Sequence, residues 1–367
     1  MTYFVKPQKY YKLIGILYFG KLKVFGDRKV LIYSTKNLLK QLLWRTRKRA
    51  IALFLLFALG LALSLVISAC SPNVAQKQSL VLRIGHQKFD PLTLVKAQGN
   101  LAEKLKPLGV SSVEWTEFQS GPPIMEALNA GSIDIARTGD APPVIAQAAN
   151  APLVYVGGSA PKNKSSAVLV KEDSPIKTIT DLKGKIVAFA KSSSANYFIV
   201  RVLESGGVKW EDIKPAYLSP ADARSAFEQG SVDAWAIWDP FYAVAQIKAK
   251  ARVLRDSDGL VTNRDFYLAN RAFAQEHPEI IDAIREETQT VAAWATKNPE
   301  QVAALLSPIL GIDTSILEVV NQRRDYSFEP MTPEMVAEQQ AIADTFHKLK
   351  IIPKPINVAD AVWQSSS

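Results

Sequence analysis

The chain has 367 residues, 48% of them hydrophobic, so it is long enough for more than one domain with a sizeable core. Its net charge of +9 is uneven: residues 1–49 carry 13 Lys and Arg with one acidic residue, residues 50–69 carry no charge, and the remainder carries 31 basic against 34 acidic residues. This mildly acidic body argues against nucleic-acid binding, which needs a basic face. One cysteine, Cys70, cannot form an internal disulfide, and three histidines without metal-ligand spacing argue against a metalloenzyme.

The N-terminal part is typical of an exported lipoprotein. Basic residues 45–49 precede the apolar run 50–69, and Ile67-Ser68-Ala69-Cys70 closes it. This resembles a bacterial lipobox, in which Cys70 would be lipidated and become the new N-terminus. The alternative is an uncleaved helix, because 20 apolar residues can span a bilayer and the basic residues before them would stay cytoplasmic. We therefore expect a basic leader or cytoplasmic tail (1–49), an apolar signal segment with a lipobox (50–70) and a tether (71–79).

From residue 80 onward, predicted strands alternate with predicted helices. Strands are predicted at 80–85, 112–118, 133–136, 153–156, 166–170, 186–190, 232–237, 253–254 and 267–269. Helices are predicted at 92–105, 123–129, 141–149, 195–204, 220–229, 278–297, 299–305, 315–322 and 333–349. Strands separated by helical segments indicate βαβ units and a mostly parallel sheet. The sequence therefore predicts an α/β protein with two lobes, 80–170 plus 265–367 and 171–264, between which the chain passes twice.

Polar residues gather where two predicted strands end and helices begin. Ligands of open α/β sheets bind beyond the carboxyl ends of the strands, and helix N-termini there suit an anion. The first junction holds Gly139 and Asp140; Asp140 is either near a ligand or simply the cap of a tight turn. The second holds Ser192, Ser193 and Ser194, whose hydroxyls could donate to an oxyanion or cap the helix.

A third junction contains two tryptophans. Trp235 and Trp238 are three residues apart, so on a strand they point to opposite faces, and Trp238, nearer the strand end, is the better candidate for a pocket wall. Gln87, after the first strand, could donate its amide to an anion. Arg137 and Lys191 could pair with that anion, although a monoanion can also be held by neutral donors and helix ends.

The body, residues 82–363, resembles the aliphatic sulfonate-binding proteins, which are type II periplasmic binding proteins of the nitrate, sulfonate and taurine group. The resemblance runs through residues 83–88, 126–134, 138–143, 153–157, 181–185, 192–196, 219–224 and, most specifically, 232–240. It implies a ligand cleft between two lobes, with the sulfonate group meeting Gln87, Gly139, Asp140, Ser192, Ser193, Ser194 and Trp238. The chain departs from the family at Phe89-Asp90-Pro91, where Phe89 is expected to narrow the cleft and Asp90 to repel a second anionic group.

The resemblance implies the substrate-binding component of an ABC transporter that imports aliphatic sulfonates. Its partners would be an alkanesulfonate and an ABC permease in the inner membrane. The protein would be periplasmic and monomeric, held at the membrane by lipidated Cys70 or an uncleaved N-terminal helix. No enzymatic activity, metal, cofactor or nucleic acid is expected. The residues alone leave open a binding protein of the same fold for taurine, nitrate, bicarbonate or a thiamine-type pyrimidine. They disfavour an enzyme, because the lipobox uses the one cysteine and the three histidines are scattered. A purely structural lipoprotein would not explain the polar junctions.

Overall fold

The computed structural model of the chain describes Trp44 and residues 79–364. The chain divides into two compact units, Met1–Gln76 and Lys77–Ser367, and only Trp44 is described in the first. The expectations for the basic leader, the apolar segment, the lipobox with Cys70 and nearly all of the tether therefore lie outside the described residues. Within the described part, no helix is both long enough and apolar enough to cross a membrane.

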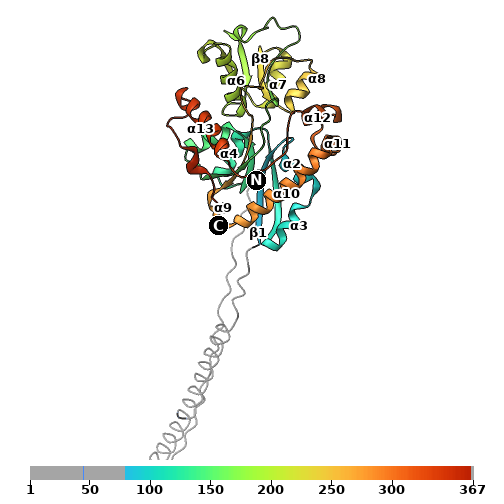
Figure 1. Ribbon diagram of the computed structural model, residues 1–367, viewed down its shortest axis with the longest axis vertical. Coiled ribbons are helices and arrows are strands. Elements are labelled where there is room, and N and C mark those ends of the chain that lie inside the picture. The colour runs from blue at the N-terminus through green and yellow to red at the C-terminus, as the bar shows by residue number, and fades with distance from the viewer. Residues whose placement is uncertain (1–43, 45–78, 365–367) are drawn as a thin grey trace, which may run out of the picture. The chain divides into compact units, whose positions relative to one another are not determined.

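The second unit contains two five-stranded sheets, each covered by helices (Figure 1). The first sheet has the order β2-β1-β3-β10-β4, with β1 parallel to β2 and β3, and β10 antiparallel to β3 and β4. Its strands are β1 (Leu80–Gln87), β2 (Val110–Phe118), β3 (Ile135–Gly139), β4 (Leu153–Gly158) and β10 (Asp265–Asn270). Helices α2 (Pro91–Gln98), α3 (Leu101–Leu105), α4 (Gly121–Asn129) and α5 (Ala141–Ala148) accompany it. We call this sheet with these helices the first lobe.

The second sheet has the order β7-β6-β8-β5-β9, with β6 parallel to β7 and β8, and β5 antiparallel to β8 and β9. Its strands are β5 (Ser166–Val170), β6 (Ile186–Phe189), β7 (Lys214–Tyr217), β8 (Ala234–Trp238) and β9 (Arg252–Asp256). With α6 (Ser194–Ser205), α7 (Pro220–Gln229) and α8 (Phe241–Lys248) it forms the second lobe. The chain crosses between the sheets at residues 159–165 and 257–264.

Strand β5 differs from the expected division, which placed residues 166–170 in the first lobe. It pairs with β8 and β9 along its length and so belongs to the second sheet. All five of its residues are buried. A short apolar run of this kind fits either sheet, and only its antiparallel partners, far away in the sequence, decide where it lies.

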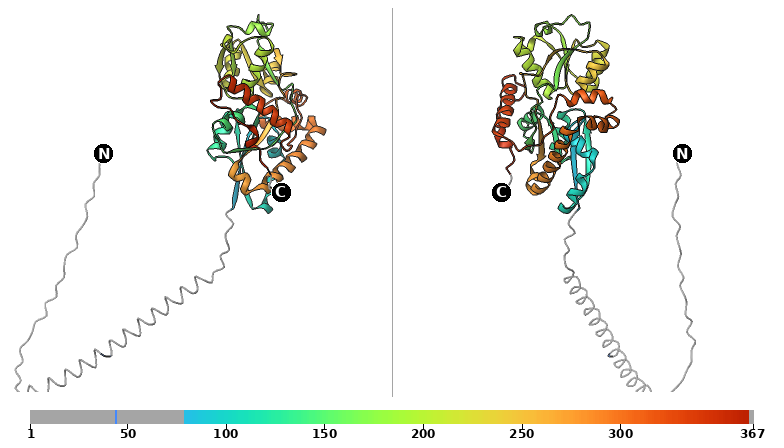
Figure 2. Two further views of the ribbon diagram at one scale, coloured as in Figure 1. Left: turned by 60° about the vertical axis from the view of Figure 1, so that its left-hand side comes forward. Right: turned by 45° about the vertical axis from the view of Figure 1, so that its right-hand side comes forward.

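The C-terminal helices contact both lobes. They are α9 (Arg271–Glu276), α10 (Pro278–Lys297), α11 (Pro299–Leu310), α12 (Thr314–Asn321) and α13 (Pro333–Lys348). Helices α10 and α11 pack against α2, and α13 packs against α5, whereas α12 packs against α8 of the second lobe (Figure 2). Four short 3₁₀ helices complete the described elements: Lys106–Leu108, Ile179–Leu182, Trp210–Asp212 and Val358–Ala361.

Local sequence explains where many helices begin and end. Asp90, Ser219 and Thr332 cap α2, α7 and α13 by accepting backbone N–H bonds, and each is followed by a proline in the first helical turn. The helix predicted at 92–105 is instead two helices, because Gly99 adopts a left-handed conformation with φ 76° and ends α2. The predicted α/β class with two sheets is confirmed.

Candidate functional site

A small cavity of about 40 Å³ lies where the two lobes meet. Its wall is formed by the ends of β1, β3 and β8, the first turns of α4, α5 and α6, both crossing segments, and Arg324 from the connection between α12 and α13. Carboxyl ends of strands and N-termini of helices from both sheets thus face one space, the position expected for a ligand of an open α/β fold.

Five of the seven predicted ligand-binding residues line this cavity: Gln87, Gly139, Ser193, Ser194 and Trp238. Trp235, the partner of Trp238 in the sequence, is fully buried and packs against Phe227 in the core of the second lobe. The side chains of this tryptophan pair therefore lie as the strand period predicts, one in the core and one at the cavity. That these five residues contact a ligand stays a prediction.

The other two predicted residues, Asp140 and Ser192, do not line the cavity. Asp140 is buried at the start of α5, where it accepts bonds from the N–H of Ala141 (2.7 Å) and from the hydroxyl of Ser194. Burial raises the pKa of Asp140, and these hydrogen bonds oppose the rise. Ser192 has a left-handed backbone (φ 64°) and its N–H donates to Oδ1 of Asn196 (3.1 Å), so it supports the start of α6. Ser192 lines a separate surface groove beside α4 and α5.

The sequence suggested that the serine hydroxyls could donate to an anion, but in the structure two of them donate to protein atoms instead. Ser193 Oγ donates to the carbonyl of Ala190 (2.7 Å), and the hydroxyl of Ser194 bonds to Asp140. The first turn of a helix leaves backbone N–H groups without carbonyl partners in the helix. The side chains of Ser193 and Ser194 are therefore bonded to the protein, and the donors that this junction leaves unused by side chains are backbone N–H groups at the start of α6.

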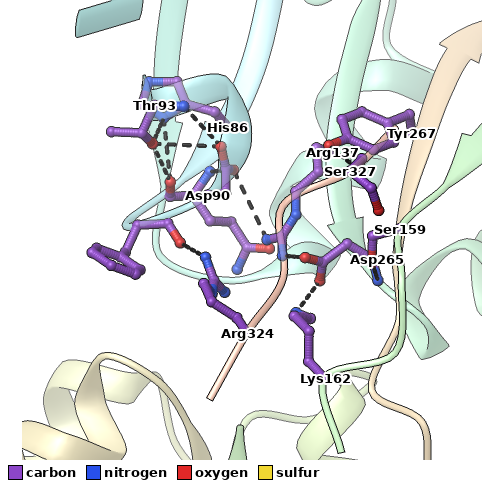
Figure 3. A network of polar contacts seen from close by, with 12 residues as sticks. His86, Asp90, Thr93, Arg137, Ser159, Lys162, Asp265, Tyr267, Arg324 and Ser327 are labelled. Carbon is purple, nitrogen blue, oxygen red and sulfur yellow. Dashed lines mark hydrogen bonds and ion pairs between the residues drawn. The ribbon is translucent and has the colours of Figure 1, made fainter. Parts of the chain in front are cut away.

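Buried charges line the cavity beside these neutral groups (Figure 3). Asp265, the first residue of β10, lies between Arg137 of β3 and Lys162 of the first crossing segment, and Lys162 Nζ is 2.5 Å from its Oδ1. Asp90 approaches Arg137 from the other side, with 3.9 Å between Oδ2 and Nη1. Burial lowers the pKa of Arg137 to about 10, opposed chiefly by Asp90. Burial also lowers the pKa of Lys162 well below its usual value, and the neighbouring Arg137 and Arg324 lower it further.

Arg324 and Asp239 complete the charged wall. Arg324 donates to the carbonyl of Phe89 and lies 5.0 Å from the centre of the Phe89 ring. Burial raises the pKa of Asp239 to about 6, against the opposing effects of Arg323 and Arg324. Arg323, just beyond α12, lies with its Nη1 3.3 Å from Asp239 Oδ1 and so ties this C-terminal segment to the second lobe.

Phe89, which departs from the family pattern, plays a different part from the one expected, whereas the repulsion of a second anionic group by Asp90 stays a prediction. Phe89 is buried in the core of the first lobe and does not line the cavity, so it does not narrow it. Asp90 is a fully buried cap that accepts bonds from the N–H groups of Gln87 (2.8 Å) and Thr93 (2.9 Å). Its charge faces Arg137. Lys191, the other cation considered from the sequence, lies over the Tyr217 ring on the surface, outside the cavity wall.

Several cavity residues were not identified from the sequence, chiefly Lys162, Asn263, Asp265 and Arg324. All four lie in crossing segments, at a strand start or in a connection, where no periodic pattern marks them. Some of these residues could have been identified from the sequence, because charged residues near the predicted crossings between the lobes lie where a ligand is expected to bind. Among the described residues, no group of three or more His, Cys, Asp or Glu side chains is arranged to hold a metal ion.

Four of the residues that line the cavity have a buried polar atom without a hydrogen-bond partner in the described part of the chain. These atoms are Thr138 Oγ1, Asn263 Nδ2, Arg137 Nε and Arg324 Nε. Buried polar groups are nearly always paired in folded proteins. Each of these atoms can donate a hydrogen bond, so the wall suits a ligand that carries acceptor oxygens and a negative charge.

Comparison with known proteins agrees with this geometry. The family model described as "NMT1/THI5 like" matches residues 113–302. A "Putative aliphatic sulfonates-binding protein" of Escherichia coli (strain K12) is 42% identical over 306 residues, covering 83% of this chain and 95% of the relative. The Bacillus subtilis (strain 168) protein of the same name is 32% identical over 306 residues, covering 82% and 92%.

Solved structures give the same result. The alkanesulfonate-binding protein SsuA from Xanthomonas axonopodis pv. citri, bound to MOPS, is 37% identical with a TM-score of 0.74, covering 78% of this chain and 98% of that one. The periplasmic aliphatic sulphonate binding protein SsuA from Escherichia coli is 42% identical with a TM-score of 0.70, covering 77% and 92%. The resemblance stated from the sequence motifs is confirmed, and the chain belongs to the family of aliphatic sulfonate-binding proteins.

Proposed function

We propose that this chain is the substrate-binding component of an ABC transporter that imports aliphatic sulfonates, and that it binds the sulfonate group in the cavity between its lobes. The observation that carries the assignment of the site is the set of unpaired buried donors on the cavity wall, Thr138, Asn263, Arg137 and Arg324. A sulfonate has three acceptor oxygens, one negative charge and no hydrogen to donate, so it matches such a wall. The named relatives support the same class of ligand.

Both lobes contribute groups that hold the ligand. The first lobe supplies Gln87, Thr138 and the backbone at Gly139, and the second supplies the start of α6 and Trp238. Because neither lobe encloses the cavity alone, binding is coupled to closure of one lobe on the other. The closed form would then dock on the membrane permease and release the sulfonate there, without chemical change.

Isothermal titration of the purified protein with methanesulfonate, ethanesulfonate, taurine, nitrate and sulfate tests the ligand class. We expect heat from the alkanesulfonates. The variant Thr138→Val, which removes one unpaired hydroxyl at nearly constant size, should weaken binding by about 5- to 20-fold. Thr345→Val is the control, because the Thr345 hydroxyl donates to the carbonyl of Ala341 on the exposed side of α13. Binding of nitrate with no response to any sulfonate would contradict the proposal.

We also propose that the chain is exported and attached to the membrane through lipidated Cys70. The support is the basic segment, the apolar run and the Ile67–Cys70 sequence at its end. The Escherichia coli relative of known structure is a periplasmic protein, which supports the export. Mass spectrometry of the protein from cells should find Cys70 as a lipidated N-terminus, and Cys70→Ser should abolish this processing. An intact chain that retains residues 1–69 would favour the uncleaved membrane helix instead.

A further inference from the structure

Four buried carboxylates and four cations lie around the cavity, and their pairing is unequal. Asp140 is held by the N–H of Ala141 and the hydroxyl of Ser194. Asp265 contacts both Arg137 and Lys162, and Asp90 also faces Arg137. In the second lobe, Asp239 is paired with Arg323, which lies just beyond α12, at 3.3 Å. The four carboxylates are between 0% and 4% exposed, so water screens these charges poorly.

Arg324 is the cation that these carboxylates leave unpaired. Within the described residues, no carboxylate oxygen lies within 4.0 Å of its guanidinium, and its hydrogen bond goes to a neutral carbonyl, that of Phe89. Its Nε is buried without a partner, and the residue lines the cavity. Lys88 also lines the cavity but is only half-buried, so water screens its charge. Of the four cations Arg137, Lys162, Arg323 and Arg324, only Arg324 has no carboxylate partner among the described residues.

A ligand with one negative charge can therefore pair with Arg324, the cation that no carboxylate holds. A ligand with two would leave an uncompensated negative charge among Asp90, Asp239 and Asp265, and burying an unpaired charge is costly. Asp265 controls this balance, because it lines the cavity and faces two of its cations at once. Without the Asp265 charge, both Arg137 and Lys162 would be available to a second negative charge on the ligand.

We propose that Asp265 makes the site selective for monoanions: by holding Arg137 and Lys162, it leaves Arg324 as the single cation that the ligand's charge meets. This inference rests on the proposed function, because it concerns the same cavity. The inference explains why the site would accept an alkanesulfonate and reject the sulfate dianion, which has the same tetrahedral head.

The test compares two ligands of similar size, methanesulfonate with one negative charge and sulfate with two, by isothermal titration at pH 7.5. The readout is the ratio of the two dissociation constants for each variant, so that a general loss of binding strength cancels. In the wild-type protein, we expect sulfate to bind at least about 100-fold more weakly than methanesulfonate, and Asp265→Asn to reduce this ratio by about tenfold or more. Asp282→Asn, on the exposed side of α10 where Asp282 pairs with Arg285 (2.5 Å), should leave the ratio unchanged.

Arg324→Gln tests the other half of the inference, the cation that the ligand's charge meets. Circular dichroism shows whether each variant folds, and Arg324→Gln serves as the test if Asp265→Asn does not. Arg324→Gln removes the unpaired cation, so methanesulfonate should bind about tenfold or more weakly, while sulfate should bind no more tightly than it does to the wild-type protein. Folded Asp265→Asn with the wild-type ratio, or Arg324→Gln with wild-type methanesulfonate affinity, would overturn the inference but leave the proposed function standing. A wild-type protein that binds no sulfonate would overturn both.

Discussion

Asp239 illustrates how burial sets the properties of single residues in this site. It follows β8 directly, is almost fully buried, and accepts a bond from the N–H of Ala243 (3.1 Å) at the start of α8. Removal from water raises its pKa from 3.8 to about 6, and the nearby Arg323 and Arg324 offset only part of that rise. The folded protein therefore binds this proton more tightly than the unfolded chain does.

The raised pKa gives Asp239 a defined effect on stability. Its contribution is fully present below the unfolded value of 3.8 and is lost as the pH rises through about 6, a change of about 3 kcal/mol. Asp239→Asn cannot titrate. We therefore expect the free energy of unfolding of the variant, relative to wild type, to rise by about that amount between pH 4 and pH 7. Urea denaturation at four pH values in this range measures it, with Asp282→Asn as the control for loss of a carboxylate. A difference that stays constant with pH would contradict the prediction.

Single residues were predictable from the sequence where a local rule applied. The strand period separated Trp235 from Trp238, and capping preference gave one of the two readings of Asp140 that were left open. Ser192 was not predictable, because its left-handed backbone directs it away from the cavity. Arg324 was not predictable either, since its partner Phe89 lies 235 positions away in the sequence.

At the scale of elements, two strand-to-helix junctions from different lobes touch each other. Gly139 ends β3 in the first lobe, and Ser194 begins α6 in the second. A Cβ added at Gly139 would lie 2.2 Å from Ser194 Oγ and 3.3 Å from Ser194 Cβ. The glycine therefore lets the two junctions approach each other beside the cavity.

This contact predicts a coupled pair of substitutions. Gly139→Ala should weaken methanesulfonate binding by about 1–3 kcal/mol, because overpacking holds the junctions apart. In a Ser194→Ala background the same change should cost clearly less, because the atom at 2.2 Å is gone and the next contact is at 3.3 Å. Isothermal titration of the four proteins in a double-mutant cycle measures the coupling. An equal cost in both backgrounds would show that the Gly139–Ser194 contact does not limit binding.

Most elements were predictable because turn and capping residues mark them, and the exceptions have physical reasons. Strand β7 (Lys-Pro-Ala-Tyr) has no buried residue and contains a proline, so it lacks the apolar run that identifies the buried strands. Helix α8 follows β8 after only Asp239 and Pro240 and so was not separated from the strand motif. Strand β5 was recognised as a strand, but its sheet depended on distant partners.

At the scale of the whole described body, the C-terminal helices join the lobes rather than covering only the first. Helix α12 packs against α8 of the second lobe, and Lys248 at the end of α8 is paired with Asp313 just before α12. Arg323, just beyond α12, reaches Asp239 and donates to Oε1 of Gln246 (2.7 Å). It also lies 4.0 Å from the centre of the Tyr242 ring. Sequence reasoning placed this region on the first lobe, because nothing local in it indicates the contact with α8.

Arg323 does not line the cavity, so its effect on binding should come through the position of the lobes. Its contacts with Asp239, Gln246 and Tyr242 hold the second lobe against α12. We expect Arg323→Ala to weaken methanesulfonate binding by about 5- to 20-fold, mainly through faster dissociation, since contacts formed on closure act after the ligand has entered. Stopped-flow measurement of both rate constants tests this, using the fluorescence of Trp238 at the cavity wall. Arg285→Ala, which breaks a pair within α10, should change neither rate constant. A slower association at an unchanged dissociation rate would instead mean that Arg323 guides the anion to the cavity rather than holding the lobes together.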